Sequence, residues 1–295
     1  MHLQPLIWLW FVATATCCAL VGGVGTGDAT LRLIPFLTVM FLVGAGAAGL
    51  WAFTARGGPE RRRLIWSLFT LAGLPVAFSS LAFVLPAIHP EPYEQRWLAL
   101  DRALFGFDPL PHMQVRGFGA LVGFLHVVYV FFYFFPIVVM SVLALRRRWA
   151  AFDRGVVAVA FGFLLSYLGY VLWPTLGPNR LGLWEVREAE PPLGAWLRAL
   201  IWRIEANPWD CFPSGHTMLT LIAWWIAWRE QRWLAWLLAP IALAIVYATM
   251  GLCYHYVVDV LAGVVGAVLA TMLAGGLQRL SAAPSGPEPG PAQST

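Results

Sequence analysis

An aspartate and a histidine near the C-terminus have the spacing of a catalytic pair. Asp259 begins an apolar run that extends to Leu273, and a carboxylate at mid-membrane depth costs roughly 2.5 to 3.5 kcal/mol unless it has a partner. His255 lies four residues earlier, so a helix would place both side chains on one face. We therefore predict that Asp259 accepts a hydrogen bond from one imidazole nitrogen of His255, which leaves the other nitrogen as a base or nucleophile.

A second histidine follows a motif suited to binding an anion. The segment Cys-Phe-Pro-Ser-Gly-His, residues 211–216, ends a polar stretch and opens an apolar one. Pro213 and Gly215 favour a tight helix entry, and Ser214 is a natural N-cap. The free N–H groups at such a helix start favour an anionic oxygen. We predict that Ser214 and Gly215 bind a phosphate and that His216 stands beside it.

Arg180 is the cation that we expect to complete this site. It ends the segment Trp-Pro-Thr-Leu-Gly-Pro-Asn-Arg, residues 173–180, which follows a long apolar run. A guanidinium can hold a phosphate through paired donors, although an interfacial anchor is an equally ordinary role. Two histidines, a carboxylate, an arginine and an anion-binding helix start form a set that suits phosphoryl transfer, provided that they converge.

The elements that must position these residues are membrane-spanning helices. Of the 295 residues, 60% are hydrophobic and only 12% are charged, which is more apolar surface than a soluble core of this length can hide. The apolar runs reach the roughly 20 residues that a helix needs to cross a membrane. We predict an all-α polytopic membrane helix bundle with about eight transmembrane helices, at residues 4–24, 31–54, 64–87, 119–145, 155–173, 215–229, 233–250 and 255–277.

These helices divide the chain into three regions. Residues 1–63 are predicted to hold two N-terminal transmembrane helices and a cytoplasmic loop, and residues 64–280 a six-helix core. Residues 281–295 are rich in Pro, Ser, Gly and Ala and predict a disordered cytoplasmic tail. Two loop segments, 88–118 and 174–214, mix charged and apolar residues as surface-lying helices do. They would act as membrane anchors or as guides for a substrate.

The arginines indicate how the chain crosses the membrane. They gather at alternate breaks between the apolar runs, at Arg61–Arg63, Arg146–Arg148, and Arg229 with Arg232. The positive-inside rule makes these breaks cytoplasmic. Both termini are then cytoplasmic, and the histidines lie at the outer face of what we expect to be the plasma membrane.

The arginines form no single exposed stripe, which argues against nucleic acid as a partner. The sequence contains no lysine, which excludes a phosphate-binding loop of the nucleotide-driven type.

At these motifs the chain resembles the type 2 phosphatidic acid phosphatase superfamily of lipid phosphatases and phosphotransferases. Pro213–His216 reproduces the P-S-G-H of that family, and His255–Asp259, followed by Gly263, reproduces its H-x-x-x-D. The resemblance covers about residues 95–277. Ala248-Thr249 stands where the family has Ser-Arg, and the Lys and Arg-Pro of its first motif are also missing, so Arg180 must replace these cations.

The chain is most similar to the branch of inositol phosphorylceramide synthase. This resemblance rests on Asp101-Arg102-Ala103-Leu104-Phe105-Gly106 and on Tyr129 to Pro136. It implies headgroup transfer between lipids as the finer expectation. The broader expectation is a membrane hydrolase or transferase that acts on a lipid phosphate or a phospholipid.

The family resemblance also implies a role for each residue of the site. His255 would attack phosphorus and form a phosphohistidine, Asp259 would orient it and support its charge, and His216 would protonate the leaving oxygen. Water or an alcohol would then accept the phosphoryl group. This chemistry requires neither a metal nor another cofactor.

Three alternatives stay open from the sequence. The departures from the family motifs would also fit a non-catalytic relative that binds or transports lipid. Two histidines and a carboxylate could hold a metal ion with open positions. Cys211 and Cys253, which precede the two histidine segments on the predicted oxidising side, could form a disulfide.

Overall fold

The chain folds into an all-helical bundle. The computed structural model describes residues 27–54, 57–83, 85, 93–115, 119–182, 191–205 and 207–282. Its helices are α2 (Gly27–Thr54), α3 (Pro59–Leu81), α5 (Glu94–Phe105), α6 (Leu110–Met113), α7 (Gly119–Phe131), α8 (Phe135–Leu145), α9 (Trp149–Leu172), α10 (Pro192–Ile204), α11 (Gly215–Glu230), α12 (Arg232–Gly251) and α13 (Val257–Ala282). The predicted all-α fold is therefore confirmed. The predicted first span, 4–24, and most of the predicted tail lie outside the described residues.

Five described helices, α2, α3, α9, α12 and α13, are long and apolar enough to cross a membrane. α7 and α8 together have the length and apolarity of a sixth span, but they are bent by 49° where the sequence predicted one straight helix. Pro136 stands in the first turn of α8, where its missing N–H leaves no hydrogen bond unmade, so a new helix begins there. α11 has 16 residues, roughly 24 Å, and is shorter than the hydrocarbon layer, as its short apolar run predicted.

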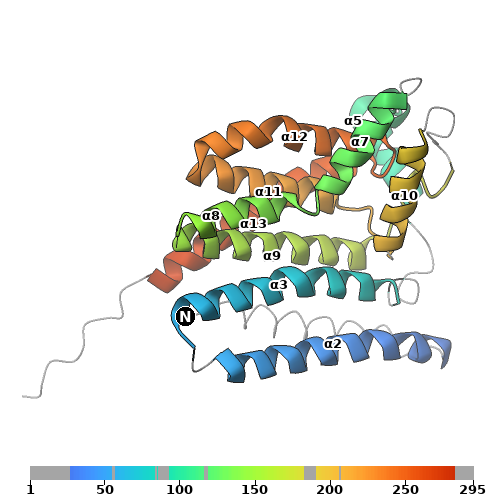
Figure 1. Ribbon diagram of the computed structural model, residues 1–295. Coiled ribbons are helices and arrows are strands. Elements are labelled where there is room, and N and C mark those ends of the chain that lie inside the picture. The colour runs from blue at the N-terminus through green and yellow to red at the C-terminus, as the bar shows by residue number, and fades with distance from the viewer. Residues whose placement is uncertain are drawn as a thin grey trace, which may run out of the picture.

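The spans lie side by side in layers (Figure 1). α8, α9, α11, α12 and α13 enclose the largest apolar core, in which Phe135, Ile222 and Ile245 are fully buried. α3 lies between α9 and α2 and forms a second core around Trp66. The indole N–H of Trp66 donates to the Thr54 hydroxyl at 3.2 Å, which ties α3 to α2.

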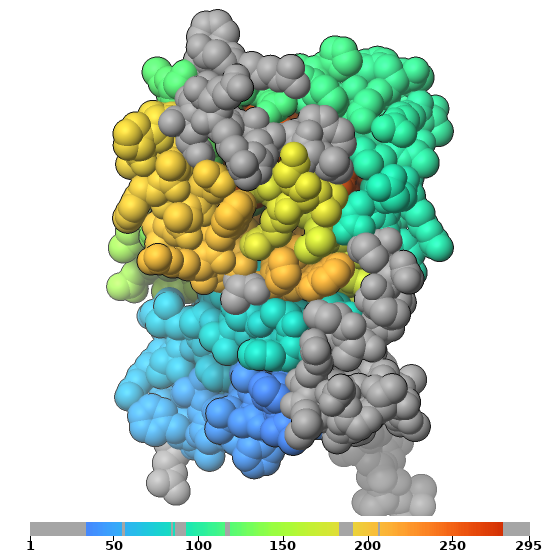
Figure 2. Space-filling view, turned by 90° about the vertical axis from the view of Figure 1, so that its right-hand side faces the viewer, coloured from blue at the N-terminus to red at the C-terminus, as the bar shows by residue number. Residues whose placement is uncertain are grey.

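Shorter elements lie across one end of the bundle. Figure 2 looks onto this end, where α10, in gold, and residues 174–182, in yellow, occupy the surface together with α5, in green. These are the two segments that the sequence predicted as surface-lying helices. They extend over the ends of the spans, where α11 and α13 begin.

The start of α11 lies close to both α13 and α9 because two positions lack a side chain. A Cβ added at Gly263 would lie 2.7 Å from the carbonyl oxygen of Ser214, and one added at Gly215 would lie 2.7 Å from the hydroxyl of Tyr170. The Ser214 amide also donates to the main-chain oxygen of Asp259 at 3.0 Å. The two histidine motifs are thus held together by backbone contact.

We predict that Gly263→Ala separates the start of α11 from α13. The new methyl group meets backbone, which cannot rotate away, so overpacking should destabilise the protein by roughly 1 to 3 kcal/mol. Gly276→Ala on the same helix is the matched control, because a Cβ there meets nothing within 4 Å and the gain in helix propensity is the same. Thermal unfolding in detergent measures both. Equal unfolding temperatures for the two variants would refute close packing at Gly263.

Candidate active site

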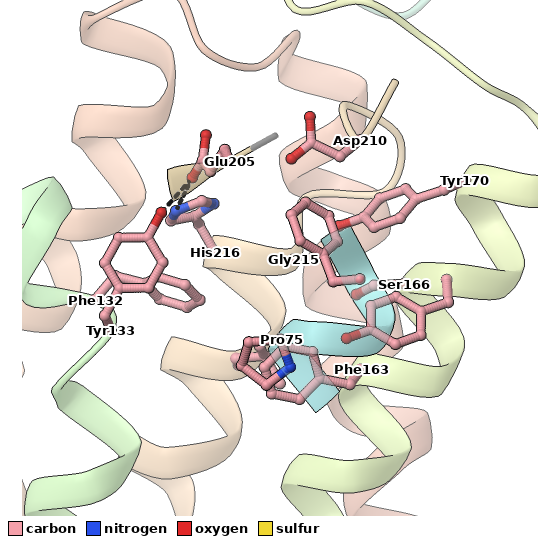
Figure 3. Close-up of a pocket in the computed structure, with 13 residues that line it drawn as sticks. Pro75, Phe132, Tyr133, Phe163, Ser166, Tyr170, Glu205, Asp210, Gly215 and His216 are labelled. Carbon is pink, nitrogen blue, oxygen red and sulfur yellow. Dashed lines mark hydrogen bonds and ion pairs between the residues drawn. The ribbon is translucent and has the colours of Figure 1, made fainter. Parts of the chain in front are cut away.

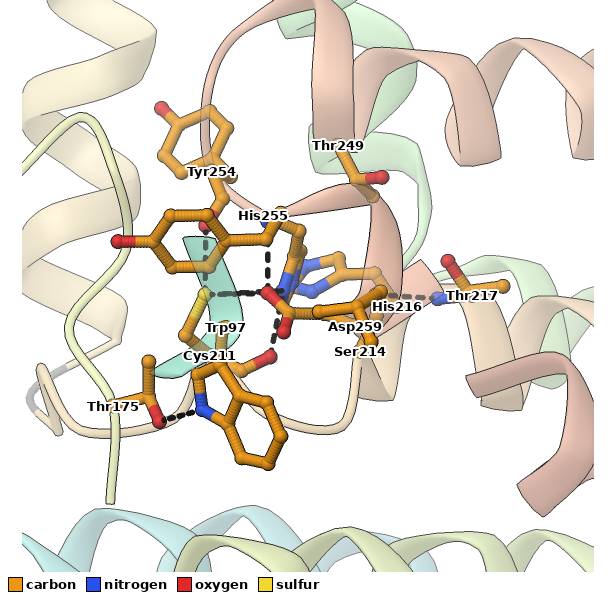
Figure 4. Close-up of polar contacts among 12 residues, drawn as sticks. Trp97, Thr175, Cys211, Ser214, His216, Thr217, Thr249, Tyr254, His255 and Asp259 are labelled. Carbon is orange, nitrogen blue, oxygen red and sulfur yellow. Dashed lines mark hydrogen bonds and ion pairs between the residues drawn. The ribbon is translucent and has the colours of Figure 1, made fainter. Parts of the chain in front are cut away.

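The structure brings the two predicted histidines together. His216 is the second residue of α11 and His255 stands two residues before α13, and their ring centroids are 5.9 Å apart (Figure 4). The exposed fractions are 7% for His216 and 4% for His255, and Asp259 is fully buried. Positions that lie 39 residues apart in the sequence therefore form one compact cluster.

Ser214 begins α11 as the sequence predicted. Its Oγ accepts a hydrogen bond from the Thr217 amide at 3.3 Å, which makes it the N-cap. Its side chain thereby satisfies one of the helix-start amides. The amides of Gly215 and His216 belong to the first turn, whose N–H groups have no partner within the helix. The predicted phosphate-binding role of Ser214 and Gly215 stays a prediction that depends on these amides.

The imidazole of His255 is oriented first by a main-chain carbonyl. Its Nδ1 lies 2.8 Å from the carbonyl oxygen of Cys211 and 3.6 Å from Oδ2 of Asp259. A carbonyl oxygen can only accept, so we assign the proton of the neutral ring to Nδ1. Nε2 then carries the free lone pair. The sequence predicted Asp259 as the acceptor, but in the structure the Cys211 carbonyl is the closer one.

Asp259 instead accepts hydrogen bonds from two other groups of the cluster. Its Oδ2 accepts hydrogen bonds from the Cys211 thiol and from the Tyr256 amide, both at 2.8 Å, and lies beside the His255 ring. Burial would lower the pKa of His255, but the neighbouring Asp259 carboxylate and the charge of Asp210 outweigh burial and raise this pKa above 6.5. Asp259 therefore favours a positive charge on His255.

Glu205 forms the corresponding pair with His216, which the sequence analysis missed. Its Oε1 lies 3.3 Å from Nε2 of His216 and accepts a hydrogen bond from the Tyr133 hydroxyl at 2.7 Å (Figure 3). Burial alone would raise the pKa of Glu205, but His216 and Tyr133 act in the opposite direction and hold it below 4.5. The available signal was an acidic residue at the end of an amphipathic helix, just before the Cys211–His216 motif.

Aromatic rings fix the plane of the His216 imidazole. Tyr129 stacks on it with centroids 4.2 Å apart and planes inclined by 25°, and Phe132 lies 4.0 Å away. The Tyr129 hydroxyl also comes within 3.4 Å of Nδ1. Phe132 belongs to the break between α7 and α8, so the bend in this span supplies part of the wall around His216.

Arg180 lies at the acidic edge of the site. Its Nη2 donates to the main-chain oxygen of Glu205 at 3.3 Å, and its guanidinium lies over the Trp202 ring at 5.4 Å. Near it, burial and the charge of Glu205 raise the pKa of Asp210 to about 7, although His255 and Arg180 oppose this shift. The guanidinium thus lies near the cluster, and its predicted role in binding phosphate stays a prediction.

α5 caps the helix that carries Asp259. The Asp101 carboxylate accepts hydrogen bonds from the amides of Val257 at 3.1 Å and Val258 at 2.8 Å, which are the first residues of α13. Burial raises the pKa of Asp101 to about 6, although these two amides act against the shift. Asp101 therefore fixes the start of α13 just after His255.

The same helix holds two loops beside the histidines. The ring of Trp97 stacks on Phe212 with centroids 4.0 Å apart, and its N–H donates to the Thr175 hydroxyl at 2.8 Å. Glu94 accepts a hydrogen bond from the Leu176 amide at 2.9 Å. α5, which lies within the segment 88–118 that the sequence predicted as an anchor or a guide, thus contacts the loops that form the site.

A cavity of about 80 Å³ opens beside His216 (Figure 3). Carboxylates line its head, at Glu205 and Asp210, and apolar and aromatic groups line the rest. It extends to Pro75 and Phe78 of α3, so this helix forms one of its walls. The lining suits a ligand with a polar end at His216 and an apolar remainder.

One set of side chains in the cluster has the composition of a metal site. Cys211, His255 and Asp259 each offer a ligand atom, and these atoms lie within 4.8 Å of one another. The Cys211 thiol donates a hydrogen bond to Asp259 at 2.8 Å, and burial together with the charge of Asp259 raises the pKa of this thiol, which disfavours the thiolate that metals bind. Cys211 and Cys253 are both free thiols, so the structure does not contain the disulfide considered from the sequence.

The family of the chain is shown by comparison with known proteins. Residues 95–273, more than half of the chain, match the family model of the PAP2 superfamily. No curated protein and no solved structure matches the chain significantly. The matched segment extends from α5 into α13 and contains both histidine motifs, Glu205 and Asp101. The chain belongs to the PAP2 superfamily.

Proposed function

We propose that the protein is a lipid phosphatase or phosphotransferase that acts through a phosphohistidine on His255. The observation that carries this proposal is the pair of buried imidazoles with centroids 5.9 Å apart, each with its own carboxylate. Members of the PAP2 superfamily are phosphatases and phosphotransferases, and the long apolar helices indicate a membrane protein. Such an enzyme would meet its substrate within the bilayer.

In the first step, the free Nε2 of His255 attacks phosphorus. A nitrogen–phosphorus bond forms, the bond from phosphorus to the lipid oxygen breaks, and the leaving oxygen takes a proton from His216. The ring of His255 becomes positively charged, and Asp259 stabilises that charge. Nδ1 keeps its proton throughout and donates it to the Cys211 carbonyl in a hydrogen bond, which keeps the ring in one orientation.

In the second step, an acceptor regenerates the enzyme. Water or an alcohol loses a proton to His216, attacks phosphorus and breaks the bond to His255. Hydrolysis and transfer then differ only in which acceptor enters the cavity. Burial lowers the pKa of His216, and Glu205 opposes that shift, so Glu205 favours the protonated ring that the first step uses and the second restores.

The charges around the cavity favour a phosphodiester. Glu205 and Asp210 both line its head, and Arg180 is the nearby cation. Glu205 is ionised because its pKa lies below 4.5, and its charge repels a monoester dianion more than a diester with one negative charge. This supports the transfer of a phospho-headgroup between lipids, as in inositol phosphorylceramide synthase, and we place the reaction at the outer membrane face, as the arginine pattern predicts.

We predict that His255→Ala abolishes turnover of phospholipids and lipid phosphates, because no other side chain replaces the nucleophile. The assay follows phosphate release and headgroup transfer by the purified protein with a lipid panel, in water and with candidate alcohols. His112→Ala, which removes an exposed histidine of α6, is the control. Unchanged turnover in His255→Ala would reject the nucleophile, and lipid binding without turnover in the natural protein would favour a non-catalytic relative.

The pH dependence of kcat/KM should reveal the effect of Asp259 on the pKa of His255. His255 attacks only when Nε2 is unprotonated, so kcat/KM should fall as the pH drops through the raised pKa of His255. In Asp259→Asn the negative charge that raises this pKa is lost. We expect a lower kcat/KM and an acid limb displaced to lower pH. A loss of rate with no displacement would mean that Asp259 acts only on structure.

Glu205→Gln should weaken proton donation by His216. We expect kcat to fall by roughly 10²-fold for an ordinary lipid ester, and by much less for a nitrophenyl phosphodiester, whose leaving oxygen hardly needs a proton. Glu60→Gln, at an exposed site on α3, is the control. Equal losses with both substrates would contradict a role for Glu205 in protonating the leaving group.

A further inference from the structure

A second cavity, of about 730 Å³, lies at the other end of the bundle. It is a groove between the ends of four helices, α3, α9, α11 and α13. The side chains that matter for its chemistry are Arg63, Arg154, Trp225, Arg229, Met272 and Arg279. His216 and Arg229 lie 13 positions apart on α11, which is roughly 20 Å. The groove is therefore separate from the histidine cluster.

Acidic neighbours neutralise only two of the four arginines. Arg63 pairs with Asp153 at 2.9 Å, and Arg154 pairs with Glu230 at 2.6 Å. Asp153 is engaged by Arg63. Glu230 is shared between Arg154 and Arg148, which lies 2.9 Å from it, so neither carboxylate offsets the other arginines of the groove.

The other two arginines are available to an anion. Arg229 and Arg279 are exposed, and within the described part of the chain neither makes an ion pair. The Arg229 guanidinium lies over the Trp225 ring at 5.4 Å, which holds it at the edge of the groove. A planar guanidinium held in this way is suited to paired hydrogen bonds with a phosphate.

An apolar track leads along α13 to these arginines. Val265, Val268 and Met272 are 60%, 54% and 67% exposed. Their spacing of three and four residues continues through Gly275 to Arg279, so all five positions share one face of the helix. A Cβ added at Gly275 meets nothing within 4 Å, so the groove is open where the track enters it.

We propose that this groove binds the phosphate headgroup of an anionic phospholipid from the membrane leaflet at that end. The headgroup would pair with Arg229 and Arg279, and an acyl chain would lie along Val265, Val268 and Met272. Basic pockets between spanning helices are suited to such headgroups. Free phosphate would bind to the two arginines alone, whereas a phospholipid would also contact the apolar side chains along α13.

The position of the groove gives the bound lipid a structural consequence. Arg63 belongs to α3, which precedes the segment that matches the PAP2 superfamily, whereas Arg154 and Arg229 belong to that segment. A headgroup in the groove would therefore lie at the boundary between α3 and that segment.

The charge is tested with the double variant Arg229→Gln/Arg279→Gln. The full chain in detergent is titrated with dioleoyl phosphatidylglycerol, and bound lipid is counted by native mass spectrometry. Each arginine near a membrane surface contributes about 1 kcal/mol, so affinity should fall roughly 30-fold. Arg232→Gln, at the same end but outside the groove, is the matched control and should keep its affinity. Equal affinities of the double variant and the control would overturn the proposal.

Two further arms test the lipid part of the proposal. Gly275→Leu should fill the groove and displace phosphatidylglycerol, whereas Gly276→Leu, with equally open space but outside the groove, should not. Phosphatidylcholine and inorganic phosphate should bind much more weakly than phosphatidylglycerol. Equal retention by the two leucine variants, or inorganic phosphate binding as tightly as the anionic lipid, would overturn the assignment to a phospholipid. All arms are repeated in a His255→Ala background, which prevents turnover of the lipid during the titration.

Discussion

The structure depends on keeping a fully buried carboxylate supplied with hydrogen-bond donors. Asp259 receives them from the Cys211 thiol and the Tyr256 amide and lies 3.6 Å from the His255 imidazole. These donors belong to two segments far apart in the chain, so satisfying one charge also fixes the loop before α11 against the start of α13. Removing one partner of a buried charge is costly. Stability and the geometry of the histidines are therefore set by the same contacts.

A second buried carboxylate, Glu205, also pairs with a histidine, but its partners come from other helices. Glu205 ends α10, pairs with His216 and takes a hydrogen bond from Tyr133 at the bend of the α7–α8 span. His255 is thus held by a carbonyl and its own neighbouring acid, while His216 is held by aromatic stacking and an acid from another helix. Two imidazoles in such different surroundings are suited to two different tasks, attack on phosphorus and transfer of a proton.

The sequence predicted the parts of the site that are encoded locally. Apolar runs predicted the helices, and the four-residue spacing of His255 and Asp259 predicted their proximity, because both depend on residues close together in the chain. Glu205 and Asp101 were missed as site residues. Their partners come from other elements, and for Asp101 the hydrogen bonds to the start of α13 join positions 156 and 157 residues apart. The bend after α7 was also missed, because its hydropathy is continuous across the break.

Under the proposed function, the wall that α3 gives to the cavity separates the chemistry from the choice of substrate. Pro75 and Phe78 line the cavity beside His216, but they precede the segment that matches the PAP2 superfamily. The acid–base and nucleophilic groups all lie within that segment. Under that proposal, a different helix at this position would admit lipids of another chain length without any change to the reacting groups. The segment that matches the family would then supply reactivity, and α3 would supply part of the selectivity.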